Sequence, residues 1–161
     1  MDRTLIDQYE SGGEKLALAI RGLTPEDLLT VSASDAGAGK WSIQQVVLHI
    51  ADSDQVMADR MKQIIAEDNP TLISFDETKW SKDLHYHDQS IQDAITIADL
   101  TRKQMARIVR KLPDSAFARF GTHNRAGPIT LEKFVRAGVD HLENHLKFIH
   151  AKRKLMGKEM W

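Results

Sequence analysis

The sequence predicts an all-α protein, a four-helix bundle with a long crossover loop between the second and third helices. Four long segments carry apolar residues at helical spacing, and almost no segment alternates with the period of a strand. A chain of 161 residues suits one domain with a hydrophobic core, so we expect a single domain over residues 1–161. Because bundles hold metals and ligands between facing helices, we expect the functional residues there.

The first long helix is expected over residues 4–21. Gly12-Gly13 forms a weak point near its middle, because glycine lowers helix propensity. The remaining pattern still gives one apolar face. The residues expected to point inward are Leu5, Tyr9, Leu16 and Ile20.

A short helix is expected next, over residues 24–29. Thr24 is suited to the N-cap position, Pro25 to the first helical position and Asp27 to the first turn. The stretch SASDAGAGK, residues 32–40, is rich in small and polar residues and predicts a loop.

The second long helix is expected to begin at WSIQQ, where Ser42 and Gln45 have the spacing of a capping box. It is expected to end near Glu67. Residues 68–89 then form a crossover that is longer than bundles usually need, and loops of this length are often functional. The residues expected to face the core are Ile43, Val46, Val47, Ile50, Met57, Met61 and Ile64.

The third and fourth helices complete the bundle. The third is expected over residues 90–112 and should end there, because Pro113 follows and stops it. After the connection FGTHNRAGP, Thr130 is expected to cap a fourth helix that reaches about Leu155. The residues of the third helix expected to point inward are Ile91, Ile95, Ala98, Met105, Ile108 and Leu112.

Composition narrows the class of protein. The formal net charge is -1, so no overall field attracts nucleic acid or anionic lipid. There is no 18-residue apolar stretch and no secretory signal pattern, so we expect a cytoplasmic protein that neither binds nucleic acid nor spans a membrane. The fourth helix ends in a basic group that we assign to the negative end of its dipole, with a nucleic-acid patch as the alternative: Lys147, Lys152, Arg153 and Lys154.

Three histidines are candidate metal ligands. In VDHLENHLKF, His145 falls within the apolar stripe of the fourth helix and His141 at its edge, whereas His49 flanks the stripe of the second helix. This geometry predicts a site between the edges of two helices, near the surface and open to solvent. Three neutral imidazoles would hold Zn²⁺ or a neighbouring transition metal and leave a position for water or substrate, which is typical of catalytic sites. The alternative is that His141 and His145 only form hydrogen bonds at a wet edge of the bundle.

Several other sites are disfavoured. The H-E-x-x-H zinc-protease motif is excluded because Leu142 follows the first histidine, and Glu143 points away from both. The fragment GAGK lacks the spacing of a phosphate-binding loop. There is no cysteine for a disulfide or a thiolate site. The remaining histidines are expected to face solvent: His85, His87, His123 and His150.

KWSIQQVVLHIADSD, a crossover containing FDETKW, and a last helix carrying VDHLENH together resemble the DinB/YfiT-like superfamily of bacterial four-helix bundles. The similarity covers essentially the whole chain. The resemblance implies a divalent metal, typically nickel or zinc, held by residues that correspond to His49, His141 and His145. It also implies frequent homodimers, and transfer or isomerisation reactions that use a low-molecular-weight thiol such as bacillithiol or mycothiol.

From the residues and this resemblance we expect a metal-dependent S-transferase that joins a low-molecular-weight thiol to a small electrophile. A coordinating thiol is deprotonated, so the metal would stabilise the thiolate. Arg60 is the candidate residue for binding an anionic thiol cofactor, and no catalytic residue beyond the ligands is assigned. The alternatives are a metal-dependent hydrolase and a stress-response protein that binds metal or ligand without turnover. Further candidates, with simple packing as the alternative for each, are Asp52 and Asp140 to orient a ring, and Trp41, Trp80 and Tyr86 to wall the pocket.

Overall fold

Polar caps set the starts of the two longest helices. In the computed structural model, which describes residues 2–31 and 39–160, α4 (Ile43–Ala66) begins after Ser42. The Ser42 hydroxyl accepts a hydrogen bond from the backbone N–H of Gln45, whose side chain in turn accepts one from the Ser42 N–H. Likewise α7 (Leu131–Leu155) begins after Thr130. Both predicted starts are confirmed, whereas most of the loop predicted over residues 32–40 lies outside the described residues.

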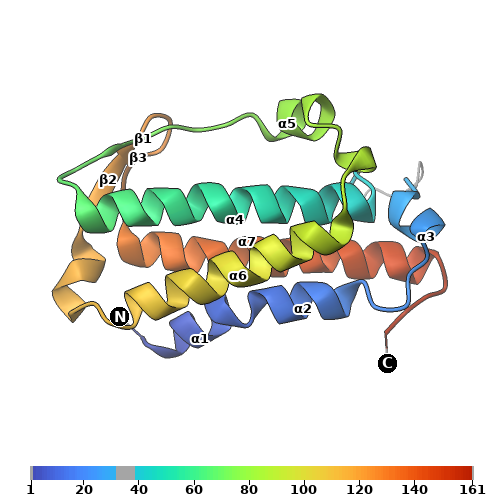
Figure 1. The fold of residues 1–161 in the computed structure, drawn as a ribbon, viewed down its shortest axis with the longest axis horizontal. Coiled ribbons are helices and arrows are strands. Elements are labelled where there is room, and N and C mark those ends of the chain that lie inside the picture. The colour runs from blue at the N-terminus through green and yellow to red at the C-terminus, as the bar shows by residue number, and fades with distance from the viewer. Residues whose placement is uncertain (1, 32–38, 161) are drawn as a thin grey trace.

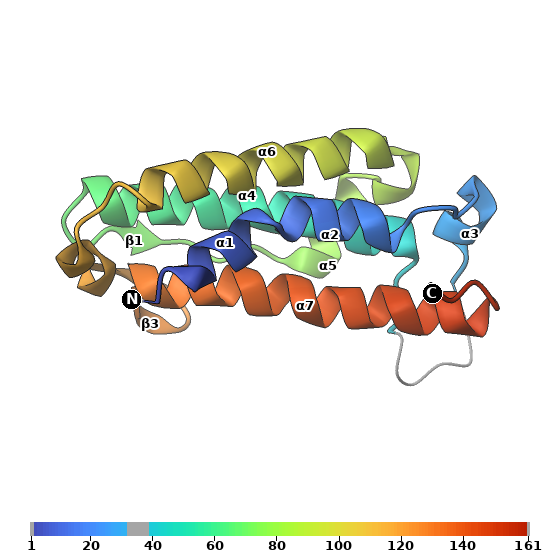
Figure 2. The same ribbon diagram turned by 90° about the horizontal axis from the view of Figure 1, so that it is seen from below.

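The bundle has four members, and one of them consists of two consecutive short helices, α1 and α2. The predicted first helix divides at Ser11 into two pieces that run alongside α6 and α7 (Figure 2). The short capped helix predicted over residues 24–29 is present as α3. The remaining bounds are α1 (Thr4–Glu10), α2 (Gly12–Ala19), α3 (Pro25–Leu29) and α6 (Ile91–Val109).

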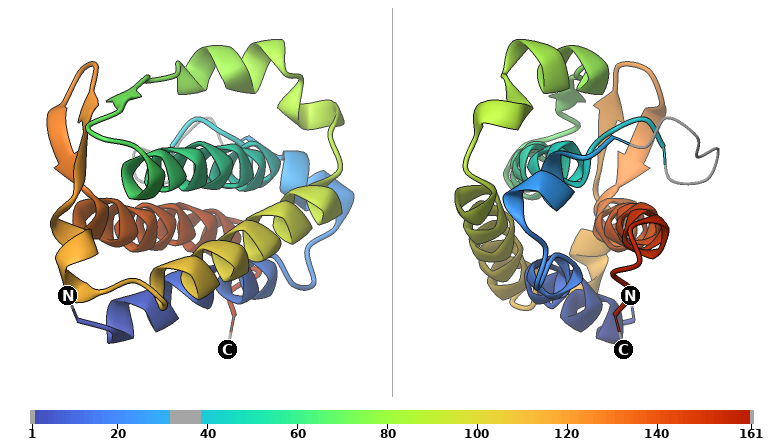
Figure 3. Two further views of the ribbon diagram at one scale, coloured as in Figure 1. Left: turned by 60° about the vertical axis from the view of Figure 1, so that its left-hand side comes forward. Right: turned by 90° about the vertical axis from the view of Figure 1, so that its right-hand side faces the viewer.

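The direction of the helices explains the long crossover. The colours of Figure 1 show that α4 and α6 run the same way along the bundle, and that α7 runs opposite to α4. The chain must therefore travel back along the whole bundle between α4 and α6. This segment runs along the face of α4 that points away from the other helices of the bundle (Figure 3).

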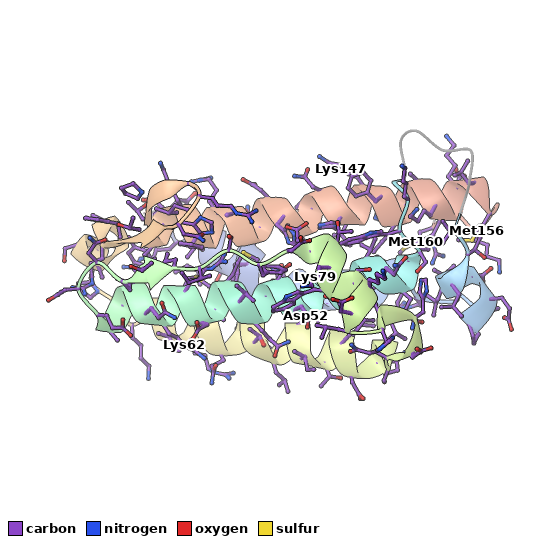
Figure 4. The ribbon with its side chains drawn as sticks, turned by 90° about the horizontal axis from the view of Figure 1, so that it is seen from above. Asp52, Lys62, Lys79, Lys147, Met156 and Met160 are labelled. Atoms are coloured by element: carbon purple, nitrogen blue, oxygen red, sulfur yellow. The ribbon has the colours of Figure 1, made fainter. Side chains whose placement is uncertain are left out.

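The crossover is more ordered than the loop that the sequence predicts. It contains the strand β1 (Thr71–Leu72), the helix α5 (Glu77–Asp83) and the 3₁₀ turn η1 (Tyr86–Asp88). The side chain of Asp76 caps α5 by accepting from the backbone N–H of Lys79 at 2.9 Å. Figure 4 looks onto this face, where Lys79 marks α5 and Lys147 marks α7.

Buried polar side chains of α4 fasten the crossover. The amide nitrogen of Gln44 lies 3.0, 2.9 and 3.1 Å from the carbonyl oxygens of Tyr86, His87 and Gln89. The buried Tyr86 also donates its hydroxyl hydrogen to Asp52. The bonds from Gln44 satisfy backbone carbonyl groups of the crossover, and together with the Tyr86–Asp52 bond they hold η1 against α4.

A small sheet corrects the all-α prediction. β2 (Phe120–His123) and β3 (Gly127–Thr130) form an antiparallel hairpin, and β1 pairs with β2 in parallel. The strands are short and contain Gly121 and Pro128, which weaken any strand pattern in the sequence. Glycine is needed at position 121, because a Cβ there would lie 2.9 Å from the side chain of Leu72.

A buried ion pair divides the core. Asp54 of α4 and Arg102 of α6 are almost fully buried and form two hydrogen bonds of 2.6 and 2.7 Å. The apolar residues of these helices fall into two clusters, one on each side of this pair along the helices. Arg102 also donates to the carbonyl oxygens of Tyr9 and Gly138, so it links all four members of the bundle.

Arg153, in the basic last turn of α7, also binds the end of another helix. The buried guanidinium of Arg153 donates to the carbonyl oxygens of Ala19 and Arg21, just at and beyond the end of α2. Carbonyl groups at a helix end lack intrahelical partners and attract cations. Lys152, Arg153 and Lys154 lie in the last turn of α7, as the predicted helix-dipole role requires, and Arg153 in addition serves the end of α2.

Replacing Gly13 with alanine is expected to destabilise the protein by about 1–3 kcal/mol, because the added Cβ would overpack the α2–α6 contact. That Cβ would lie 2.5 Å from the Asp99 Cα, which is backbone and cannot move aside. Urea unfolding would measure the change. The neighbouring exposed Glu14→Ala should shift stability by no more than about 0.5 kcal/mol, and equal effects of the two changes would contradict the packing argument.

Candidate metal centre

Three histidines meet where the antiparallel helices α4 and α7 pack together. His49 comes from α4, and His141 and His145 come from successive turns of α7. The Nε2 atom of His141 lies 3.1 Å from the Nε2 of His49 and 3.1 Å from the Nε2 of His145. Among the described residues, these three form a group whose ligand atoms all lie within 4.8 Å of one another. The three predicted residues are thus brought together.

The depth of the cluster differs from the prediction. His49 has an exposed fraction of 0%, whereas its helix face predicts a flank near the surface. The flank is covered because the ring of Trp41 packs edge-on against His49, with 5.1 Å between centroids, and because α5 crosses outside it. His141 and His145 are only partly buried. The cluster is therefore closed on the α4 side and open towards α7.

All three rings are neutral at neutral pH. Burial lowers the pKa of His49 to about 3, with a further contribution from repulsion by His141 and His145. Burial and the neighbouring His145 lower the pKa of His141 to about 4, and burial lowers the pKa of His145 as well. Neutral imidazole is the form that binds metals, because its free nitrogen has a lone pair to donate.

The donor set fits a divalent transition metal. Two nitrogen ligands about 2.0–2.1 Å from one ion at a tetrahedral angle lie roughly 3.3 Å apart, close to the 3.1 Å from the Nε2 of His141 to each of the other two Nε2 atoms. Three neutral imidazoles facing one another, one of them fully buried, are otherwise poorly satisfied, since each neutral ring has only one N–H to share. Three protein ligands also leave coordination positions free, which distinguishes catalytic from structural zinc sites.

The Nδ1 atoms of the three rings have few hydrogen-bond partners. Ser53 lies one turn from His49, and its hydroxyl oxygen is 3.4 Å from the His49 Nδ1. The Nδ1 atoms of His141 and His145 are buried and have no hydrogen-bond partner among the described residues. The prediction that Asp52 or Asp140 orients a ring is therefore wrong, because Asp52 binds Tyr86 and Asp140 is exposed to solvent.

One carboxylate near the cluster was missed by sequence reasoning. An oxygen of Glu77, at the first position of α5, lies 4.0 Å from the His49 Nε2, and the Glu77 side chain is 58% exposed. The available signals were the N-cap Asp76 and the motif FDETKW, which carried no assigned role. Glu77 is positioned because the crossover is fastened along α4, which sequence spacing does not reveal.

Arg60, the candidate for binding a thiol cofactor, lies away from the histidines. It is three turns further along α4, roughly 16 Å along the axis, and it donates a hydrogen bond to the carbonyl oxygen of Ile73. Trp41 contacts His49 as expected, whereas Trp80 packs on Phe75 and Tyr86 is buried against α4. Binding of an anionic thiol by Arg60 stays a prediction.

The remaining histidines do not join the cluster. The Nδ1 of His123 accepts from the backbone N–H groups of Arg125 and Ala126 and so closes the turn of the hairpin. The Nε2 of His87 lies 3.1 Å from the hydroxyl of Ser42. His85, His87 and His150 are exposed, as predicted, whereas His123 is partly buried.

The fold and the cluster define a class of protein: a helical bundle with a three-histidine centre between two antiparallel helices. Comparison with protein families identifies the family within this class. The chain belongs to the DinB superfamily, whose family model matches residues 8–149. Within residues 2–31 and 39–160, no helix has both the length and the apolarity needed to cross a membrane.

Two bacterial relatives share the name "Putative metal-dependent hydrolase". YfiT from Bacillus subtilis is 30% identical over 155 residues, which cover 94% of this chain and 84% of YfiT. OB0782 from Oceanobacillus iheyensis is 29% identical over 112 residues, which cover 70% of this chain and 64% of OB0782, just under two thirds of its length. The solved structure of YfiT, described as a four-helix bundle of unusual topology, matches with a TM-score of 0.88 at 26% identity, covering 96% of this chain and 86% of that one.

Proposed function

We propose that this protein is a metal-dependent hydrolase of small esters or amides. The observation that carries the proposal is the convergence of three neutral imidazole nitrogens, closed on one side and partly open on the other. The names of the relatives favour hydrolysis over the thiol transfer expected from the sequence, because they describe metal-dependent hydrolases. The metal, nickel or zinc by the family resemblance, is part of the proposal.

The histidines would hold the ion through Nε2, and the two short Nε2–Nε2 distances to His141 support this. A bound divalent ion would lower the pKa of a water molecule to about 7 and would polarise a carbonyl oxygen. Ser53 would keep the His49 ring oriented through Nδ1, as partners of the outer nitrogen do in other metal sites. Trp41 shields the buried side of His49 from solvent.

Glu77 is the residue we assign to proton transfer. Its carboxylate lies 4.0 Å from the His49 Nε2 and is exposed to solvent. It would accept a proton from the attacking water while the water oxygen bonds to the carbonyl carbon. The same proton would pass to the leaving oxygen or nitrogen as the bond to the carbonyl carbon breaks, so the carboxylate is regenerated.

The direct test is hydrolysis of p-nitrophenyl esters and anilides by zinc- or nickel-loaded protein. We expect turnover that disappears after chelation and returns when the metal is added back. Glu77→Gln should lower kcat at least about 100-fold, the size typical for loss of a general base, while metal content is unchanged. Asp83→Asn, an exposed carboxylate at the far end of α5, should change kcat less than about twofold.

Three outcomes would contradict the proposal. Turnover of an electrophile such as 1-chloro-2,4-dinitrobenzene only when bacillithiol is added would favour the S-transferase. Tight metal binding without turnover of any substrate would favour a protein that binds metal or ligand without catalysis. Hydrolysis that survives complete removal of metal would exclude the histidine cluster as the reactive centre.

A further inference from the structure

An apolar pocket opens directly beside the histidine cluster. It has a volume of about 200 Å³ and lies between the start of α4 and the middle of α7. One wall is the ring of His145 itself, which packs against the ring of Phe148 with 5.8 Å between centroids. The lining residues are Gly39, Lys40, Trp41, Val46, His145 and Phe148.

The pocket and the crossover carboxylate lie next to different histidines of the cluster, the pocket next to His145 and Glu77 next to His49. Glu77 approaches from the crossover next to His49, whereas the residues that line the pocket come from α4, α7 and the segment just before α4. In the proposed reaction the leaving group must receive its proton from Glu77, so it has to point towards the crossover. The other substituent of the carbonyl carbon then points towards His145 and the pocket.

We propose that this pocket binds an uncharged apolar group on the acyl side of the scissile bond. The substrates are then esters or amides of short-chain or aromatic carboxylic acids. This inference rests on the proposed hydrolase function and adds the substrate class to it. The walls of the pocket support this proposal, because Trp41 and Phe148 contribute aromatic rings and Val46 a branched aliphatic side chain. Phe148, one of the lining residues, is 36% exposed.

The volume limits the size of the group. An engineered apolar cavity of about 150 Å³ is known to hold one benzene molecule, so about 200 Å³ suits a phenyl group or a chain of roughly four to six carbons. A charged group would lose its hydration against the apolar walls, and the lining cation Lys40 is exposed to solvent, so its attraction for an anion is screened. An apolar group should gain about fourfold in kcat/KM for each methylene that it buries.

The test uses zinc-loaded protein and p-nitrophenyl esters of acetic, butanoic, hexanoic and decanoic acids. We expect kcat/KM to rise by at least about tenfold from acetyl to butanoyl or hexanoyl and to fall for decanoyl. Phe148→Ala should move the optimum to longer chains, and Phe148→Trp should move it towards acetyl. Phe120→Ala removes a phenylalanine of similar exposure on β2, 43% against 36% for Phe148, and should leave the profile unchanged.

A second readout separates this inference from the hydrolase proposal. Saturation-transfer NMR with benzyl alcohol should detect binding to wild type and to Phe120→Ala, and affinity at least about fivefold weaker in Phe148→Ala. If no ester is cleaved but this binding pattern holds, the pocket stands and hydrolysis is wrong. If chain length has no effect on turnover, or if wild type and Phe148→Ala bind benzyl alcohol equally or not at all, the acyl pocket is wrong.

Discussion

Arg102→Met is expected to lower the free energy of unfolding by about 3–5 kcal/mol, a large part of the stability of a domain of this size. The substitution keeps the volume of the side chain but leaves the Asp54 carboxylate buried with an exposed fraction of 0% and without its cation. It also removes the bonds to the carbonyl oxygens of Tyr9 and Gly138. Urea unfolding followed by circular dichroism would measure the change.

Two controls define the cause of this effect. Arg110→Met breaks an exposed ion pair with Asp7 and Glu10 and should cost no more than about 1 kcal/mol. The double variant Asp54→Leu with Arg102→Met replaces both charges by apolar groups and should recover much of the lost stability. If Arg102→Met and Arg110→Met cost the same, the buried pair does not organise the core.

His49→Ala is expected to weaken the binding of Zn²⁺ or Ni²⁺ by at least about 100-fold. Removing one of three protein ligands costs more than removing a residue that only orients a ligand, for which losses of about 10- to 100-fold are typical. His49 is the most informative of the three, because it is fully buried and comes from a different helix than the other two. Titration calorimetry on protein without an affinity tag would give the dissociation constants.

The matched control for this change is His150→Ala, which removes an exposed histidine from α7. Its metal affinity should stay within about twofold of the wild-type value. Thermal unfolding of both variants without metal checks that the bundle still forms. Retention of wild-type affinity by a folded His49→Ala protein would show that the metal binds elsewhere.

The helices were predictable because their signals are local. The capping box of Ser42 and Gln45 and the caps Thr24 and Thr130 place helix starts within a few residues of sequence, and each start is confirmed. Helical spacing also places His141 and His145 on one face. The prediction that both lie near His49 came from the bundle fold together with the family resemblance. The structure does bring the three rings together.

Features that depend on distant contacts could not be predicted. Asp54 and Arg102 are charged, so the apolar pattern places neither in the core, and their pairing joins helices that are far apart in sequence. The burial of His49 depends on Trp41 and the crossover, which a helix face considered alone does not include. The nearby Glu77 escaped notice for the same reason, since only the docked crossover brings it there.

The connection between α4 and α7 has a consequence for how the protein matures during its synthesis. His49 and His141 are separated by 92 positions, and α6 and the hairpin lie between them in the chain. A nascent chain that has completed α4 therefore displays only one of the three rings. The cluster forms after α7 has left the ribosome and packed against α4, so an ion that binds to all three rings would be acquired late, by a nearly completed bundle.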